Sequence, residues 1–339
     1  MFKQLLAASI AVGVLAATAE AQDGGTIERI KVHSPSLEGN LQGNSADRDV
    51  VVYLPPGYAS NTNRRYPVVY QLHGWLPSAE VWSNMISLKA GADKAIANGT
   101  AREMIVVLPD ALTIFEGSMY STSVTTGDFE GFVVRDLVEY IDTHYRTIAE
   151  RASRGLSGHS MGGYGTLRLA MKHPELYSSF YAMSSCCLTP YVADDEGNRA
   201  ASEVTTLEEA DAAAVFTKVP LSLAAAWSPN PEKPPLYFDF PLVDGVVQPL
   251  IIAKWNANVP LAMIDQYIPN LKRYDAIGLE VGRQDGLAAA NRELSRVLTS
   301  YGIEHGFATY EGDHTNRVAE RFEGAVLPFF SAHLKFDER

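Results

Sequence analysis

Short runs of β-branched and aromatic residues alternate along this chain with stretches in which apolar residues recur every three or four positions. Runs of the first kind are typical of buried strands, and stretches of the second kind are typical of helices with one apolar face. The predicted strands are residues 66–74, 105–108, 180–184, 277–282 and 306–310. Helical spacing follows the last two of them, over residues 288–300 and 318–327. This order predicts an α/β domain in which helices connect the strands.

A Gly-x-Ser-x-Gly motif lies between a strand-like run and an amphipathic helix, where residues 158–162 read Gly-His-Ser-Met-Gly. In a nucleophile elbow the serine occupies a sharp turn from strand to helix, which exposes its hydroxyl at the edge of the sheet. The backbone is crowded there, so glycine is expected at Gly158 and Gly162. The context predicts that Ser160 is a nucleophile, and an ordinary glycine-rich turn is the alternative.

A carboxylate and a histidine follow the serine in the order serine, acid, histidine that an α/β hydrolase requires. Asp285 comes after the predicted strand 277–282, and His314 comes after the strand 306–310 and before the last helix. This order predicts an α/β-hydrolase fold, with a mostly parallel central sheet and helices on both faces. The competing acids are Asp275 and Asp313, and the competing bases are His305 and His333.

The competing residues are less favoured because of their positions. Asp275 and His305 precede their strands and would lie at the far end of the sheet. Asp313 is adjacent to the favoured histidine in a loop, where it is better explained as a turn residue. His333 falls near the end of the last helix.

Two backbone N–H groups are candidates for an oxyanion hole. In α/β hydrolases one donor is the residue after the nucleophile, and the other comes from a loop that follows an earlier strand. That strand here ends in a His-Gly pair, so the predicted donors are Met161 and Trp75, with Leu76 as the alternative to Trp75. His73 and His159 belong to the same loops and are predicted to be structural or to form part of the substrate-binding wall.

Five segments carry a resemblance to a known family: residues 51–58, 70–74, 129–137 with its continuation at 144–146, 155–165 and 282–286, the last taken with His314. On these segments the chain resembles the esterase family that includes feruloyl esterases, S-formylglutathione hydrolase (esterase D) and the mycobacterial mycolyltransferases. The resemblance covers most of the chain and is weakest between residues 190 and 258. It implies hydrolysis or transfer of an acyl group, with Ser160, Asp285 and His314 at the matching catalytic positions.

Residues 188–258, between the nucleophile and the acid, are predicted to form a small cap over the site. A helix-compatible, alanine-rich run over residues 207–217 precedes a region rich in proline and aromatic residues. Trp227 and Trp255 from this region, and Tyr120 from an earlier loop, are candidates for contact with the substrate. The alternative for each is simple packing, and for any single aromatic this alternative is favoured.

The chain has 339 residues, 46% of them hydrophobic, and a formal net charge of -12. This is ample apolar material for a single domain, predicted over residues 22–339. The acidic balance argues against a nucleic-acid partner, which would favour a basic patch. The chain contains neither a phosphate-binding loop motif nor a His-Glu-x-x-His motif, so no cofactor and no metal is predicted.

Residues 1–21 have the pattern of a signal peptide: an early lysine, an apolar run too short to span a membrane, and an Ala-x-Ala site before Gln22. We therefore expect export, to a bacterial periplasm or beyond the cell. The two cysteines, Cys186 and Cys187, are adjacent. Two buried thiols at a strand end are slightly favoured over a vicinal disulfide, although an oxidising compartment would permit one.

The leading hypothesis is an exported serine carboxylic-ester hydrolase that forms an acyl-enzyme on Ser160. Its substrate is expected to be a small to medium ester, with carbohydrate-linked and aromatic esters among the options. An acyltransferase with the same triad is the alternative, since only water access and an acceptor site separate the two. A non-catalytic binding protein on this fold is less favoured because the candidate triad is complete.

Overall fold

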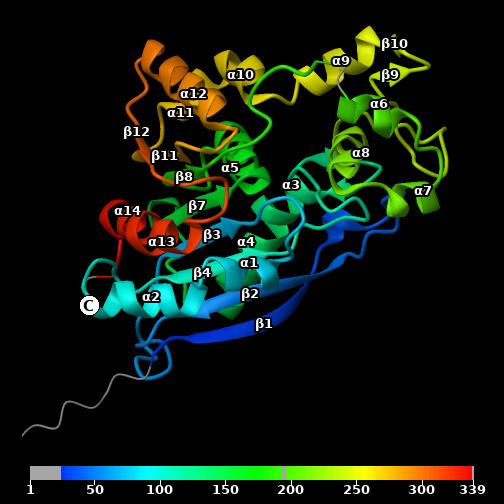
Figure 1. Ribbon diagram of the computed structural model, residues 1–339. Helices are drawn as coiled ribbons and strands as arrows, with labels where there is room; N and C mark the ends of the chain where they lie inside the picture. The colour runs from blue at the N-terminus through cyan, green and yellow to red at the C-terminus, as the bar shows by residue number, and fades with distance from the viewer. Residues whose placement is uncertain (1–23, 193–195, 338–339) are drawn as a thin grey trace, which may run out of the picture.

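An eight-stranded, mostly parallel sheet runs through the molecule (Figure 1). The structure is a computed structural model that describes residues 24–192 and 196–337. The strand order is β1-β2-β4-β3-β7-β8-β11-β12, in which β1 pairs antiparallel with β2, β2 pairs antiparallel with β4, and the other pairs are parallel. The strands are Thr26–His33 (β1), Asp47–Leu54 (β2), Val68–Leu72 (β3), Ile105–Pro109 (β4), Arg154–His159 (β7), Ser179–Met183 (β8), Ala276–Gly282 (β11) and Gly306–Tyr310 (β12).

Helices cover both faces of the sheet because its inner strands carry apolar side chains on both sides. Val52 and Val107 pack into one core, while Val51 and Val106 pack into a second core on the opposite face. The first core includes side chains of α4 (Leu137–His144), α5 (Met161–Lys172) and α12 (Ala288–Ser300). The second includes side chains of α1 (Ala79–Met85), α2 (Leu88–Ala97), α13 (Val318–Arg321) and α14 (Leu327–His333). The predicted fold class is confirmed.

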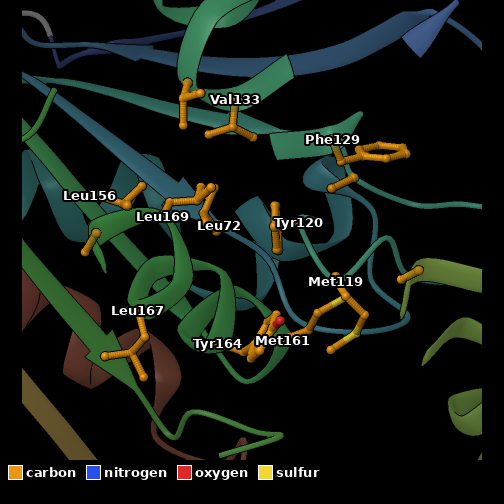
Figure 2. Packing of buried hydrophobic residues seen from close by; sticks show 14 of the residues in the cluster. Leu72, Met119, Tyr120, Phe129, Val133, Leu156, Met161, Tyr164, Leu167 and Leu169 are labelled. Atoms are coloured by element: carbon orange, nitrogen blue, oxygen red, sulfur yellow. The ribbon is translucent and has the colours of Figure 1, made fainter. Parts of the chain in front are cut away.

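The first core anchors the helix that follows the serine motif. Figure 2 shows Leu72 of β3 and Leu156 of β7 close to Leu169 of α5, and all three side chains are buried. A π-helical turn, Phe132–Asp136, joins α3 (Phe129–Gly131) to α4 on the same side of the sheet. The packing of α5 against β3, β7 and β8 therefore fixes where the chain turns after β7.

The elements of the segment 188–258 lie at one end of the molecule (Figure 1), and their buried side chains continue the first core. The helices of the segment are α6 (Glu196–Ser202), α7 (Leu207–Ala212), α8 (Val215–Trp227) and α9 (Pro249–Asn256), and a hairpin pairs β9 (Leu242–Val243) with β10 (Val246–Val247). Three short helical segments, α10 (Pro260–Met263), a 3-10 turn Ile264–Tyr267 and α11 (Ile268–Leu271), lead from it to β11.

The predicted single helical run over 207–217 is wrong, because the chain breaks there and starts a second helix. Ala213 is extended, with φ -63 and ψ 148, and Ala214 is extended as well. From Val215 the new helix continues to Trp227, and its last eight residues are all buried. Burial of this second apolar stretch outweighs the alanine content that suggested one helix.

The predicted signal peptide, residues 1–21, lies outside the described residues. Within the described part of the chain, no helix is both long enough and apolar enough to cross a membrane.

Candidate active site

Ser160 lies at the sharp turn between β7 and α5. Its backbone has φ 57 and ψ -115, a conformation that residues other than glycine rarely adopt. A side chain added at Gly158 would overlap the carbonyl group of Gly162, and one added at Gly162 would overlap the carbonyl group of Leu72. Strand, turn and helix approach so closely that both glycines are required. This is the geometry of a nucleophile elbow.

Three side chains that are far apart in sequence form one hydrogen-bonded chain. Ser160 Oγ lies 2.9 Å from His314 Nε2, and His314 Nδ1 lies 2.8 Å from Asp285 Oδ2. Since an ionised carboxylate only accepts, Nδ1 carries the proton and Nε2 accepts from the serine hydroxyl. The three meet because β7, β11 and β12 are parallel strands of one sheet, and each residue follows the carboxyl end of its strand.

Asp285 is held in its ionised form behind the histidine. Its side chain is 2% exposed, whereas that of His314 is 36% exposed. Burial alone would raise the pKa of Asp285, but hydrogen bonds from His314 and from the Leu287 N–H hold this pKa below its ordinary value. A buried carboxylate in this position fixes the imidazole ring and stabilises its protonated form.

The competing acids and bases lie away from this chain of hydrogen bonds. Asp275, His305 and His333 line a different cavity, of about 550 Å³, at the amino ends of β11 and β12. Asp313 is next to His314 in sequence, but its carboxylate accepts the backbone N–H groups of residues 315 and 316. It therefore closes a local turn.

The backbone N–H groups of Trp75 and Met161 are among those beside Ser160 that have no acceptor in the described part of the chain. The Leu76 N–H, by contrast, donates to the carbonyl oxygen of Glu116 at 3.1 Å. A Cβ at Gly74 would lie 3.4 Å from the Ser160 Cβ, so Trp75 directly follows a residue packed against the serine. The arrangement leaves Trp75 and Met161 available to an oxyanion, and Leu76 is engaged elsewhere.

His159 contacts His314 through a hydrogen bond to its backbone. Its Nε2–H donates to the carbonyl oxygen of His314 at 2.7 Å, and its ring stacks on Trp82 with the centroids 5.1 Å apart. Burial, with a smaller contribution from the charge of His314, lowers the pKa of His159 to about 3. His159 is therefore neutral at physiological pH and acts as a fixed donor that also forms part of a cavity wall.

Two apolar cavities meet at Ser160, and both are also lined by Trp75 and His314. The first, of about 370 Å³, is further lined by Gly74, Leu76, Pro77, Val81, Trp82, Met85, His159 and Thr315. The second, of about 390 Å³, is further lined by Met119, Met161, Cys186, Cys187, Phe216, Val219, Asp285 and Leu287. The lining residues, all within the described chain, include no lysine or arginine.

Four residues predicted as candidates for substrate contact lie in the protein core and line neither cavity. His73 accepts the Ala111 N–H at Nε2, and the Tyr120 hydroxyl donates to the His73 carbonyl oxygen at 3.0 Å. Trp227 and Trp255 are 4% and 0% exposed, with their indole N–H groups bound to serine hydroxyls. Their polar atoms are satisfied inside the protein, so the packing alternative holds for these side chains.

Several cavity residues were missed from the sequence. Val81 and Met85 are 49% and 37% exposed and stand four positions apart on α1, so they form one apolar strip at the mouth of the first cavity. Two apolar residues four positions apart, close after the His-Gly pair, are a sequence pattern from which this part of the cavity could have been predicted. Phe216 and Val219 of α8 gave no such signal, since apolar residues occur on every side of that helix.

The sheet order and the serine at the elbow define an α/β-hydrolase fold. More particularly, the chain belongs to the family described as Putative esterase, whose profile matches residues 44–324. Over 144 residues it is 32% identical to an endo-1,4-beta-xylanase/feruloyl esterase of Xylanibacter ruminicola, covering 41% of this chain and 20% of that protein. It is 31% identical over 144 residues to an esterase of Mycobacterium tuberculosis, covering 40% of this chain and 28% of that protein. The chain thus spans between a fifth and a third of the length of these curated relatives.

Solved structures show the same fold. A ferulic acid esterase matches with a TM-score of 0.65 at 21% identity, covering 92% of this chain and 99% of that one. An S-formylglutathione hydrolase from Agrobacterium tumefaciens matches with a TM-score of 0.59 at 18% identity, covering 92% and 96%. The similarity extends over nearly the whole of both folded chains.

Proposed function

We propose that this protein is a serine carboxylic-ester hydrolase. The observation that carries the proposal is the continuous hydrogen-bonded chain from Asp285 through His314 to Ser160, beside two unused N–H groups. Membership of the esterase family supports it independently.

In the proposed mechanism, His314 Nε2 removes the proton of the Ser160 hydroxyl as its oxygen attacks the ester carbonyl carbon. The N–H groups of Trp75 and Met161 donate to the oxygen that becomes negative, and removal of one such donor typically costs ~10²–10³ in kcat. His314 then returns the proton to the departing alcohol. Water attacks the resulting acyl-enzyme by the same route, while Asp285 keeps the imidazole oriented.

The two cavities indicate which esters fit. Ser160 lies where they meet, so the acyl group and the alcohol group of a bound ester would extend into different cavities. Both linings are predominantly apolar and contain no cationic side chain among the described residues, which favours uncharged aromatic or medium-length aliphatic groups on both sides. A substrate with free carboxylates, such as S-formylglutathione, would lose their hydration without gaining an ionic partner.

The test is hydrolysis of p-nitrophenyl esters of increasing acyl length by the wild type and by Ser160→Ala. The wild type is expected to turn over these esters, and kcat is expected to fall by up to ~10⁶ in the variant, as in other serine triads. Circular dichroism of Ser160→Ala serves as the folding control. Wild-type rates in a folded variant would contradict the mechanism, and ester exchange onto an added alcohol in place of hydrolysis would make the protein an acyltransferase.

We further propose that the protein is exported. The proposal rests on the signal-peptide pattern of residues 1–21. Sequencing of the amino terminus of the mature protein checks it: a start at Gln22 is expected, and a retained leader would contradict it.

A further inference from the structure

Cys186 and Cys187 are the two cysteines of the chain, and both line the 390 Å³ cavity beside Ser160. Both residues are free cysteines of intermediate burial, with the two Sγ atoms 2.7 Å apart. Non-bonded carbon atoms, which are smaller than sulfur, stay ~3.5–4.0 Å apart, and a disulfide bond measures ~2.05 Å. The two sulfurs are thus already closer than an ordinary contact, and roughly 0.7 Å of movement would bring them to bonding distance.

The backbone on both sides holds the pair in this position. Before it, the Ser185 N–H donates to Asn291 Oδ1 at 3.1 Å, and Asn291 Nδ2 donates back to the Ser185 carbonyl oxygen at 2.9 Å. After it, the carbonyl oxygen of residue 188 accepts the N–H of residue 261 at 3.2 Å. Cys187 itself has φ 58, in the left-handed region that side chains seldom occupy. Strained backbone of this kind persists only where the surroundings enforce it, and it is concentrated at functional sites.

We propose that Cys186 and Cys187 form a thiol–disulfide exchange site, at which a small-molecule disulfide oxidises them to a vicinal disulfide in the cavity wall. One cysteine, after losing its proton, attacks a sulfur of the external disulfide and releases one external thiol. The other cysteine then loses its proton and attacks the protein-bound sulfur of this mixed disulfide, which releases the second external thiol. The pair loses two protons and two electrons, and the external disulfide takes up both as two thiols.

Both thiols must lose a proton during the exchange. A hydrogen bond to Cys187 and burial raise the pKa of the Cys186 thiol well above its ordinary value. Either cysteine can make the first attack, and the thiol that does so must first lose its proton. Disulfides with strained geometry are easily reduced, so the bridge is expected to form and open reversibly.

The bridge would act on the neighbouring serine through two routes. The Cys186 N–H donates to the Ser160 carbonyl oxygen at 3.1 Å, so any shift of the pair reaches the elbow. The two sulfurs also share the cavity wall with Phe216 and Val219, and drawing them together changes its shape. This effect rests on the proposed ester hydrolysis. Formation of the bridge is expected to change the ratio of kcat/KM between a short and a long ester by about tenfold, which is the effect of about one methylene group in an apolar pocket.

The first experiment needs no enzymatic activity. The full chain is incubated with excess 2-hydroxyethyl disulfide, then unfolded, alkylated with iodoacetamide and weighed intact. The wild type is expected to lose two hydrogen atoms and to carry neither an adduct nor an alkyl group. Cys186→Ser, which keeps one thiol and lacks a second one to displace the adduct, is expected to retain one mercaptoethanol adduct. Two adducts on the wild type, two alkylated thiols, or a cross-linked dimer would overturn the proposal.

The second experiment compares kcat/KM for short and long p-nitrophenyl esters before and after oxidation. The double variant Cys186→Ser/Cys187→Ser is the control, and its ester preference is expected to be unchanged by the disulfide reagent. An oxidised wild type with the same ester preference as the reduced form would refute the effect on the cavity. A protein inactive in both redox states would instead refute the proposed function, while the mass measurement would stand by itself.

Discussion

The carboxyl edge of the sheet and the segment 188–258 both place large apolar side chains near Ser160, but their polar groups are used differently. At the edge of the sheet, the N–H groups of Trp75 and Met161 have no acceptor among the described residues, and Ser160 is of intermediate burial. In the segment, the indole N–H groups of Trp227 and Trp255 both donate to buried serine hydroxyls. Unused polar groups beside apolar cavities distinguish the candidate site, whereas aromatic content alone does not.

The largest expected effect is a loss of kcat on substitution of Asp285 at the carboxyl edge of the sheet. Asp285→Asn removes the charge that orients His314 and favours the wrong tautomer of its ring, so kcat for p-nitrophenyl esters is expected to fall by ~10⁴. The buried position of Asp285 and its hydrogen bond to His314 are the reason for this size. The measurement is steady-state kinetics on a variant shown to be folded.

Asp313→Asn is the matched control, because it makes the same chemical change one residue before His314. Its carboxylate only closes a turn through the N–H groups of residues 315 and 316. We expect kcat close to the wild-type value, because the Oδ1 of an asparagine can accept the same two N–H groups. If Asp313→Asn proved the more damaging of the two, the acid would have to be reassigned.

The two regions also differ in how far the sequence predicted them. The strand and helix bounds near Asp285 and His314, including the helix 288–300 and the strand 306–310, were predicted closely because the apolar period changes sharply there. Chain order and strand ends then bring the three polar residues to one edge. The break between α7 and α8 depends on which apolar face finds a partner in the folded core, and this is set by tertiary packing.

The segment is expected to affect stability far more than catalysis. Trp255→Ala removes a fully buried ring that contacts Tyr191, Trp227 and Phe240 edge to face. Loss of a buried tryptophan of this size is expected to lower the free energy of unfolding by ~3–5 kcal/mol, measured by urea denaturation. In the fraction that remains folded, kcat for a short ester is expected to stay near the wild-type value.

Phe216→Ala is the control for this variant, since its ring belongs to the same segment and is 83% exposed. Its free energy of unfolding is expected to change by no more than ~0.5 kcal/mol. A large loss of kcat in folded Trp255→Ala would show that the segment positions catalytic groups, and the contrast between the two regions would fail.

A cluster of charges joins the two regions. Glu130 of α3 accepts hydrogen bonds from Arg168, Lys172 and His173, of which the first two belong to α5 and the third follows it. Arg168 in turn donates to Asn258 Oδ1 at 2.8 Å, at the end of the segment. Burial alone would raise the pKa of Glu130, but its basic neighbours lower this pKa to about 2. The carboxylate that connects α3 with α5 and, through Arg168, with the segment is therefore ionised in all but strong acid.

The smallest expected effect follows from this pKa. The pKa of Glu130 falls from an ordinary 4.5 to about 2 on folding, so its ionisation stabilises the folded state above pH 4.5, and this contribution is lost as the pH falls toward 2. The shift corresponds to about 3 kcal/mol.

Glu130→Gln should therefore be less stable than the wild type by about that amount at pH 7. The difference in free energy of unfolding should become smaller when urea denaturation is repeated at pH 4 and pH 3. Glu150 and its partner Lys335 are both exposed, so Glu150→Gln should have nearly the same free energy of unfolding as the wild type at pH 7 and at pH 3. If the difference in free energy of unfolding between Glu130→Gln and the wild type stayed constant with pH, then packing, and not the charge of Glu130, would hold α3 and α5 against the segment.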